Sequence, residues 1–302
     1  MLISSITAST LKQYESNLRY WWSFTHLRSI DYFNSRPTDI IDFLNLRFNE
    51  GGSYSTLNTA CSAISLISVY DINNDGLISR FMKGVYKQKP TRPKYATTWD
   101  ITPVLDYFEK LHPLKDLRLK DAAGKVATLL ALTTAQRLQT LSLINIDNIT
   151  RSETGINIKI TDRIKTSEPG AFHPELILPF FKERTALCVA SAVLEFCEYT
   201  KNLRKKDTKA LFIMTRKPFG AASSQTISHC IKSVLKKAGI DTNQFTAYST
   251  RHAAVSRAHK RDVDISIIKR SAGWTPSSLT FFKFYNRPIQ TCNDQLARAI
   301  FH

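Results

Sequence analysis

The chain has 302 residues, with 42 Lys and Arg against 25 Asp and Glu, a net charge of +17 and a pI near 9.7. A hydrophobic content of 43% is normal for a protein with a packed core, and the length favours two domains over one. The charge argues against an ordinary small-molecule enzyme and favours a nucleic-acid-binding protein, with merely solvated lysines as the alternative.

The cysteines are odd in number and scattered, and no two of them form a C-x-x-C pair: Cys61, Cys188, Cys197, Cys230 and Cys292. The pattern indicates neither a zinc site nor a disulfide framework, so we expect a reducing compartment and no metal. No apolar run is long enough to span a membrane, and the N-terminus lacks a signal-peptide pattern. We therefore expect a soluble intracellular protein that does not contact membranes.

Four amphipathic helices are predicted in the first third of the chain. Ser9 or Thr10 caps a helix that runs to about residue 24, and Pro37 opens a second helix that ends at Gly51. The third and fourth are expected at about 54–70 and 77–86. Short amphipathic helices in succession predict a small bundle.

A calcium site is excluded in the segment that precedes the fourth helix. The residues from Asp71 to Gly76 resemble the first half of a calcium-binding loop, but Met82 stands where a bidentate glutamate should close the shell. We interpret Asp75-Gly76 instead as a turn that caps the following helix.

A basic segment separates the two predicted domains. Residues 76–98 contain six basic residues and no acidic one, and two prolines within 89–94 prevent helix continuation. We expect a helical domain at 1–88, a linker at 89–98 and a second domain at 99–302. The linker suits an extended path along a phosphate backbone, with a plain solvated linker as the alternative. The predicted DNA-binding residues are Lys83, Lys87, Lys89, Arg92 and Lys94.

The second domain is predicted to be mainly α-helical with a small β-sheet. Residues 155–161 alternate apolar and polar side chains, as a half-buried strand does. Further strands are expected at 163–167 and 175–178, with a turn at 169–170. An apolar helical stretch at 125–132 leads into Arg137, and the later helices are expected at 185–199, 224–238 and 265–270.

Several separated residues supply the chemistry needed to cut a phosphodiester. Arginine donates paired hydrogen bonds to phosphate oxygens, tyrosine forms a reversible phosphodiester, and lysine can protonate a departing oxygen. A free phenol has a pKa of about 10, so such a tyrosine needs positive charge nearby. Each residue alone has a simpler explanation, such as a surface ion pair or a core position. The candidates are Arg137, Lys165, Arg251, Trp274 and Tyr285.

In their order and local contexts, these residues resemble the tyrosine recombinases of the phage-integrase family. The similarity is greatest to those encoded by eukaryotic mobile elements of the DIRS, Ngaro and Crypton types. It rests on Ala135-Gln-Arg137-Leu-Gln-Thr140-Leu, Lys165-Thr166-Ser, Phe245-Thr-Ala-Tyr-Ser-Thr-Arg251, Ala272-Gly-Trp274 and Phe282-Lys-Phe-Tyr285-Asn-Arg-Pro288.

The resemblance implies a fold, a reaction and a role for each residue. The fold would be an N-terminal helical core-binding bundle and a C-terminal catalytic domain. Arg137 and Arg251 would clamp the phosphate, Lys165 would be the general acid on a strand hairpin, Trp274 would contact the scissile phosphate, and Tyr285 would be the nucleophile. No metal or cofactor is implied. The product would be a 3′-phosphotyrosine link with a free 5′-hydroxyl.

The resemblance also implies partners and a cellular location. Family members act on double-stranded DNA as a homotetramer that joins two sites through a Holliday junction. We expect a monomer or dimer without DNA, and the nucleus if the host is a eukaryote. Residues 291–301 would form a C-terminal helix that docks on a neighbouring subunit.

Two positions depart from the family pattern. Tyr248 stands where the family has a histidine three residues before the second arginine, and a phenol is a poorer base than imidazole. His252, next to Arg251, does not fill that position. Thr140 stands where many members have an acidic residue, so activity is expected to be slower or dependent on assembly.

A site-specific recombinase or integrase is the leading hypothesis. The alternatives are a catalytically impaired DNA-binding protein descended from a recombinase, and a type IB topoisomerase-like enzyme that relaxes supercoils. The intact catalytic set argues against the first alternative, and the Phe-Tyr-Asn-Arg-Pro segment argues against the second.

Overall fold

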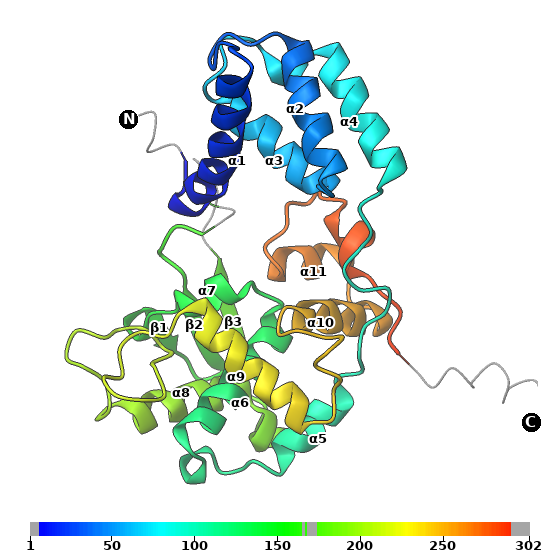
Figure 1. Ribbon diagram of the computed structural model, residues 1–302. Coiled ribbons are helices and arrows are strands. Elements are labelled where there is room, and N and C mark those ends of the chain that lie inside the picture. Colours follow the sequence, from blue (N-terminus) through cyan, green and yellow to red (C-terminus); the bar gives the residue numbers. More distant parts are fainter. Residues whose placement is uncertain (1–5, 165–166, 168–173, 291–302) are drawn as a thin grey trace, which may run out of the picture. The chain divides into compact units, whose positions relative to one another are not determined.

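The computed structural model describes residues 6–164, 167 and 174–290 (Figure 1). The chain forms two compact units, Met1–Arg92 and Pro93–His302. Within the described residues, no helix combines the length and the hydrophobicity that crossing a membrane would require.

The first unit is a bundle of α-helices, as predicted. Its helices are α1 (Ala8–Leu27), α2 (Pro37–Asn49), α3 (Tyr54–Ser65) and α4 (Gly76–Gln88), with a 3-10 turn at Ile72–Asn74 (Figure 1). The third helix is shorter than expected. After Ser65 the backbone tightens into turns, and the Val69 N–H leaves the helical pattern to donate to the Phe33 carbonyl at 2.9 Å.

Aromatic side chains form the centre of the first unit. Trp21 is fully buried, with its ring centroid 5.2 Å from that of Phe43 in an edge-to-face arrangement and its indole N–H donating to the Tyr32 carbonyl at 3.1 Å. In α4, Ile78, Met82 and Val85 are buried at helical spacing and complete the core. The bundle therefore buries one face of each helix against the others.

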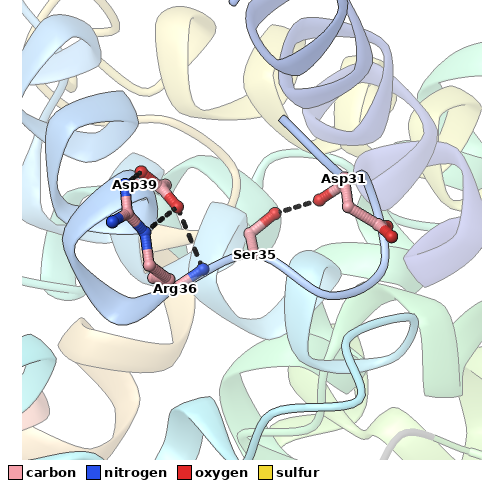
Figure 2. Close-up of polar contacts among 4 residues, drawn as sticks. All are labelled: Asp31, Ser35, Arg36 and Asp39. Atoms are coloured by element: carbon pink, nitrogen blue, oxygen red, sulfur yellow. Dashed lines mark hydrogen bonds and ion pairs between the residues drawn. The ribbon is translucent and has the colours of Figure 1, made fainter. Parts of the chain in front are cut away.

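Carboxylates fix the start of two helices in this unit. Asp39 accepts hydrogen bonds from the Arg36 backbone N–H at 3.0 Å and from its Nε at 3.1 Å, and Ser35 donates to the Asp31 carbonyl (Figure 2). The hydrogen bond from Arg36 holds the pKa of Asp39 below its usual value. Asp75 accepts from the Ile78 N–H at 2.8 Å, which confirms the predicted cap of α4.

The second unit contains most of the chain and is mainly helical. Its helices are α5 (Thr102–Glu109), α6 (Leu119–Thr134), α7 (Leu138–Ser142), α8 (Val189–Thr200), α9 (Ser224–Lys237), α10 (Ser249–Lys260) and α11 (Ile265–Ser271), followed by a π-turn at Phe281–Tyr285. The predicted helices at 125–132, 185–199, 224–238 and 265–270 lie within or across α6, α8, α9 and α11. The predicted start of α8 is too early, because Lys182–Leu187 forms a 3-10 segment.

Helix α6 is the centre of the second unit and packs against α8, α9 and α10. Every residue from Ala122 to Ala131 is buried, Lys125 and Thr128 included, so this part of the helix is enclosed on all sides. A Cβ at Gly124 would lie 2.9 Å from Val234 Cγ2 in α9. The absence of a side chain at Gly124 therefore sets the close approach of these two helices.

A three-stranded antiparallel sheet flanks the helices, in the order β1 (Ile149–Arg151), β2 (Gly155–Lys159), β3 (Glu175–Pro179). Ile156 pairs with Leu178, and the buried side chains of β2 and β3 face the core. Two predicted strands are confirmed as β2 and β3, whereas the short β1 was not predicted. The expected strand at 163–167 is wrong for its described residues, because Ile164 and Ser167 bond to each other in a turn.

The segment that opens the second unit is anchored in its interior. Tyr95 and Trp99 are buried, and their polar atoms bond to Thr246 Oγ1 and Ser249 Oγ, both at 2.8 Å. Thr98 pairs with Ile289 in a parallel bridge. The last residues of the predicted linker are thus packed against the backbone on either side of α10, where the candidate site lies.

Candidate active site

Arg137 is positioned by an abrupt end to α6. Ala135 adopts a left-handed conformation with φ of 50°, which terminates the helix, and Arg137 then forms the N-cap of α7. Gln136 is buried between them, and its Nε2 donates to the Ser271 carbonyl at the end of α11, at 2.6 Å. This hydrogen bond fixes the Arg137 loop relative to α11.

Arg251 is a buried cation in the first turn of α10, with an exposed fraction of 2%. Its Nη2 donates to the Ala272 carbonyl at 2.8 Å, while Nε and Nη1 have no hydrogen-bond partner among the described residues. Burial lowers the pKa of Arg251 to about 10, and Arg137 acts in the same direction. Two buried donors of a cation are therefore free to bind an anion.

The first turn of α10 begins after Tyr248. Tyr248 is the N-cap, and Ser249 and Thr250, although good capping residues, lie inside the helix. The hydroxyls of Ser249 and Thr250 donate to the backbone carbonyls of Thr246 and Ala247. This places Tyr248, Arg251 and His252 on one face of the helix.

Tyr285 lies in the π-turn and is almost completely buried, with 7% of its surface exposed. Its ring centroid is 4.5 Å from that of His252 and 4.7 Å from that of Trp274, and the Arg251 guanidinium carbon lies 5.1 Å from it. Its backbone carbonyl accepts a hydrogen bond from Ser256 Oγ at 3.2 Å. The phenol is thus held between α10 and the Trp274 loop.

Tyr248 is hydrogen-bonded to Tyr285 through their hydroxyl groups. Unlike Tyr285, it is well exposed, at 42%. Burial of its hydroxyl end and the hydrogen bond to Tyr285 raise the pKa of Tyr248, while the nearby charges of Arg251 and Arg137 oppose the rise. Arg137 therefore lies close enough to lower the pKa of both Tyr248 and Arg251.

His252 is a member of this cluster that sequence reasoning set aside. Its ring is buried and stacks on Tyr285, and neither ring nitrogen has a partner among the described residues. Burial lowers its pKa to about 4, with smaller contributions from Arg287, Arg251 and Lys94. Its position four residues after Tyr248 was the signal that could have identified it.

Trp274 completes the cluster from the loop after α11. Its ring lies 4.3 Å from the Arg251 guanidinium carbon, and its indole N–H is buried without a partner in the described part of the chain. The backbone turns from α11 into this loop at Gly273, which adopts a left-handed conformation with φ of 67°. Arg251 and Trp274 together offer three unpaired buried donor atoms, and groups of this kind stabilise an oxyanion.

Other predicted residues lie elsewhere. Lys165 falls in the connection between β2 and β3 and is outside the described residues, as are residues 291–301. The five predicted DNA-binding residues are exposed. Of these, Lys83 and Lys87 lie on α4, Lys89 donates to the Gly51 carbonyl at 2.8 Å, and Lys94 lies in the second unit with its Nζ 5.4 Å from the Tyr95 ring centroid. In the described ranges, no three His, Cys, Asp or Glu side chains are grouped as a metal site.

The sequence that carries this site matches a known protein family. The model of the phage integrase family matches residues 109–290, which is more than half of the chain and includes Arg137, Arg251, Trp274 and Tyr285. The protein belongs to the phage integrase family. The chain matches no curated protein sequence.

Solved structures of integrases bound to DNA have a similar fold. The integrase of transposon Tn1549 in complex with transposon right end DNA has a TM-score of 0.62 and 14% identity, covering 98% of this chain and 93% of that one. A lambda integrase dimer bound to a COC′ core site has a TM-score of 0.57 and 16% identity, covering 95% and 74%. A lambda integrase tetramer bound to a Holliday junction has a TM-score of 0.54 and 14% identity, covering 96% and 76%.

Proposed function

We propose that this recombinase cuts and rejoins DNA at specific sites through a 3′-phosphotyrosine intermediate, with Tyr285 as the nucleophile. The observation that carries the proposal is the grouping of the Tyr285 phenol with the buried, unpaired donors of Arg251 and Trp274. Buried cationic donors without partners are costly unless a ligand satisfies them, and a phosphate would do so.

Each residue then has a role in one displacement reaction. The Tyr285 oxygen attacks the phosphorus, its new bond forms as the 5′-oxygen departs, and Arg251, Arg137 and the Trp274 indole stabilise the charge that develops on the non-bridging oxygens. Lys165 donates the proton to the departing 5′-oxygen. Attack by a 5′-hydroxyl from a partner strand reverses the reaction and releases Tyr285.

We further propose a role in the integration or excision of a mobile element of the DIRS, Ngaro or Crypton type. The Phe284-Tyr285-Asn286-Arg287-Pro288 segment supports this assignment. The first unit would be the DNA-binding core domain, with the exposed lysines of α4 and the residues to Lys94 on the phosphate backbone. Assembly as a homotetramer on two duplexes is supported by the similarity to the lambda integrase tetramer on a Holliday junction.

The decisive experiment traps the covalent intermediate. A library of random-sequence duplexes, each with a nick near its centre, is incubated with the protein, because loss of the short strand beyond the nick prevents religation. DNA that stays bound to protein on a denaturing gel is recovered and sequenced. We expect enriched sequences from the wild type and no adduct from Tyr285→Phe, which keeps the ring but lacks the nucleophilic oxygen.

Matched controls separate the possible outcomes. Tyr199→Phe loses a hydroxyl that donates to the Leu117 carbonyl at 3.0 Å, in the same unit, and should form the adduct normally. An adduct that persists in Tyr285→Phe would refute the nucleophile. Tight DNA binding by the wild type without any adduct would favour the catalytically impaired DNA-binding alternative. Supercoil relaxation without exchange between two sites would favour the topoisomerase-like alternative.

A further inference from the structure

We propose that Ser256 is a positioning residue for the nucleophile: its hydroxyl holds the backbone of Tyr285 so that the phenol stays beside the unpaired donors of Arg251 and Trp274. The inference rests on the proposed function, because it concerns the orientation of the same nucleophile. We assign Ser256 no contact with the phosphate, and its effect on the reaction passes through Tyr285 alone.

The Ser256 hydroxyl joins α10 to the backbone on both sides of Asn286. Ser256 Oγ donates to the Tyr285 carbonyl at 3.2 Å, and the Arg287 backbone N–H donates to Ser256 Oγ at 3.0 Å. One hydroxyl therefore serves as donor and as acceptor to the same short stretch of chain. Because Ser256 is only 3% exposed, water has little access to compete for these two hydrogen bonds.

A serine inside a helix has another acceptor close at hand. Ser and Thr hydroxyls in helices can bond to the backbone carbonyl four residues earlier. In this chain Thr128, Thr134 and Thr200 do so, each at 2.7 Å. Ser256 lies inside α10, yet the described structure shows its hydroxyl donating to a carbonyl 29 residues later in the chain. The contact is thus a tertiary one, which local helix geometry does not explain.

The backbone that Ser256 holds belongs to the π-turn that carries the nucleophile. The Asn286 N–H closes this turn by donating to the Phe281 carbonyl at 2.8 Å. Turns of this kind are rare and occur frequently at functional sites. Since Ser256 is bonded to the residue before Asn286 and to the residue after it, the hydroxyl fixes the place where the turn ends.

Helix α10 therefore holds the nucleophile at two points that are one helical turn apart. His252, four residues before Ser256, stacks on the Tyr285 ring with centroids 4.5 Å apart, while Ser256 holds the Tyr285 carbonyl. Stacking alone leaves a ring free to slide along its partner, whereas a hydrogen bond to the backbone fixes the origin of the side chain. Together the two contacts set the distance from the phenol ring to Arg251, which lies on the same helix.

The first test measures cleavage and DNA binding separately. Single-turnover adduct formation at saturating DNA, and the DNA affinity, are measured for the wild type, Ser256→Ala and Ser256→Cys on one sequence recovered from the nicked library. We expect Ser256→Ala to slow cleavage on the order of 10²-fold with unchanged affinity, because a nucleophile misplaced by about 1 Å has an effect of this size. Ser256→Cys, whose thiol is a weaker donor and acceptor, should lie between the two.

Thr200 provides a matched control, because its buried hydroxyl also acts as donor and as acceptor. It donates to the Phe196 carbonyl at 2.7 Å and accepts from Arg204 Nη2 at 2.8 Å, in the same unit. Thr200→Val removes these bonds and keeps the shape of the side chain. Thermal unfolding should show lower stability for both Thr200→Val and Ser256→Ala, whereas only Ser256→Ala should slow cleavage.

A fluorine label reports on the position of the nucleophile without DNA. Fluorotyrosine is placed at position 285 alone in the wild type, Ser256→Ala and Thr200→Val, and the fluorine NMR spectra are compared. We expect the same spectrum from the wild type and Thr200→Val. Ser256→Ala should give a shifted or broadened resonance, because the released backbone lets the ring take up other positions.

The outcomes distinguish the positioning role from the proposed function. The positioning role is overturned if Ser256→Ala cleaves at the wild-type rate, if Thr200→Val slows cleavage equally, or if slow cleavage by Ser256→Ala comes with an unchanged fluorine spectrum. No adduct from the wild type on any DNA in the library would overturn the proposed function, and with it the catalytic meaning of Ser256. The fluorine spectra would then still show whether Ser256 fixes Tyr285.

Discussion

The ring of His252 lies nearly parallel to that of Tyr285, with centroids 4.5 Å apart and planes inclined by 21°. The two residues come from α10 and from the π-turn near the end of the described chain. Their contact holds the candidate nucleophile against a rigid helix, and it also places a histidine where water does not reach. This arrangement has a measurable consequence for stability.

Folding stability should fall as the pH falls from about 6.5 towards 4. Burial lowers the pKa of His252 to about 4, from an unfolded value of about 6.5, so in this window the unfolded state binds more protons. The loss is at most about 3 kcal/mol. We expect His252→Phe, which keeps an aromatic ring but cannot titrate, to lose less stability over the same range.

Urea denaturation between pH 4 and 7.5 measures this effect as the difference between the wild type and His252→Phe. The exposed His229 provides a control, since His229→Gln should follow the wild-type curve. If the free energy of unfolding depended on pH in the same way for the wild type and His252→Phe, a buried neutral histidine would be contradicted.

Arg251→Lys should abolish most covalent adduct formation without unfolding the protein. A lysine carries the charge, but its donors all lie on one nitrogen, so it cannot reproduce the planar group that holds the Ala272 carbonyl through Nη2 and presents Nε and Nη1 to a phosphate. We expect a loss on the order of 10²–10³-fold in the cleavage rate. The exposed Arg261, which is the C-cap at the opposite end of α10, gives the matched control, and equal effects of Arg251→Lys and Arg261→Lys would refute the specific role.

Two glycine-to-alanine substitutions should have opposite effects on folding stability. A Cβ at Gly124 in α6 would clash with Val234 Cγ2, whereas one at Gly84 in α4 meets no atom within 4 Å. We expect Gly124→Ala to destabilise the second unit by about 1–2 kcal/mol, because overpacking outweighs the gain in helix propensity. Gly84→Ala should stabilise the first unit by about 0.5–1 kcal/mol.

Thermal unfolding of each variant checks this pair of predictions. Addition of Val234→Ala to Gly124→Ala should restore part of the lost stability, because it removes the clashing methyl group. An increase in stability from Gly124→Ala alone would show that α6 and α9 are less tightly packed than described.

DNA affinity should depend steeply on salt, and the lysines of α4 should contribute to that dependence. Each phosphate contact adds about 0.9 to the slope of log K against log salt, so the double variant Lys83→Ala/Lys87→Ala should reduce the slope by about 2. The exposed Lys115, which is outside the predicted set, serves as a control. Fluorescence anisotropy at several salt concentrations measures the slopes, and an unchanged slope would exclude these lysines.

Much of the fold was accessible from the sequence because its signals are local. Asp75 caps α4, Pro37 opens α2, and alternation marks β2, all through interactions within a few residues. The prediction of a strand at 163–167 was wrong because it, too, relied on a local signal alone. Local alternation does not reveal that Ile164 and Ser167 close a turn on each other.

The sequence by itself determined the candidate residues, since Arg137, Arg251, Trp274 and Tyr285 stand in recognisable local patterns. Only the tertiary structure decided that His252 stacks on Tyr285, that Tyr248 bonds to its hydroxyl, and that Arg251 and Trp274 keep unpaired donors. These contacts join α10 to a segment about 30 residues later in the chain. Long-range packing sets them, and no periodicity or spacing in the sequence encodes which side chains meet.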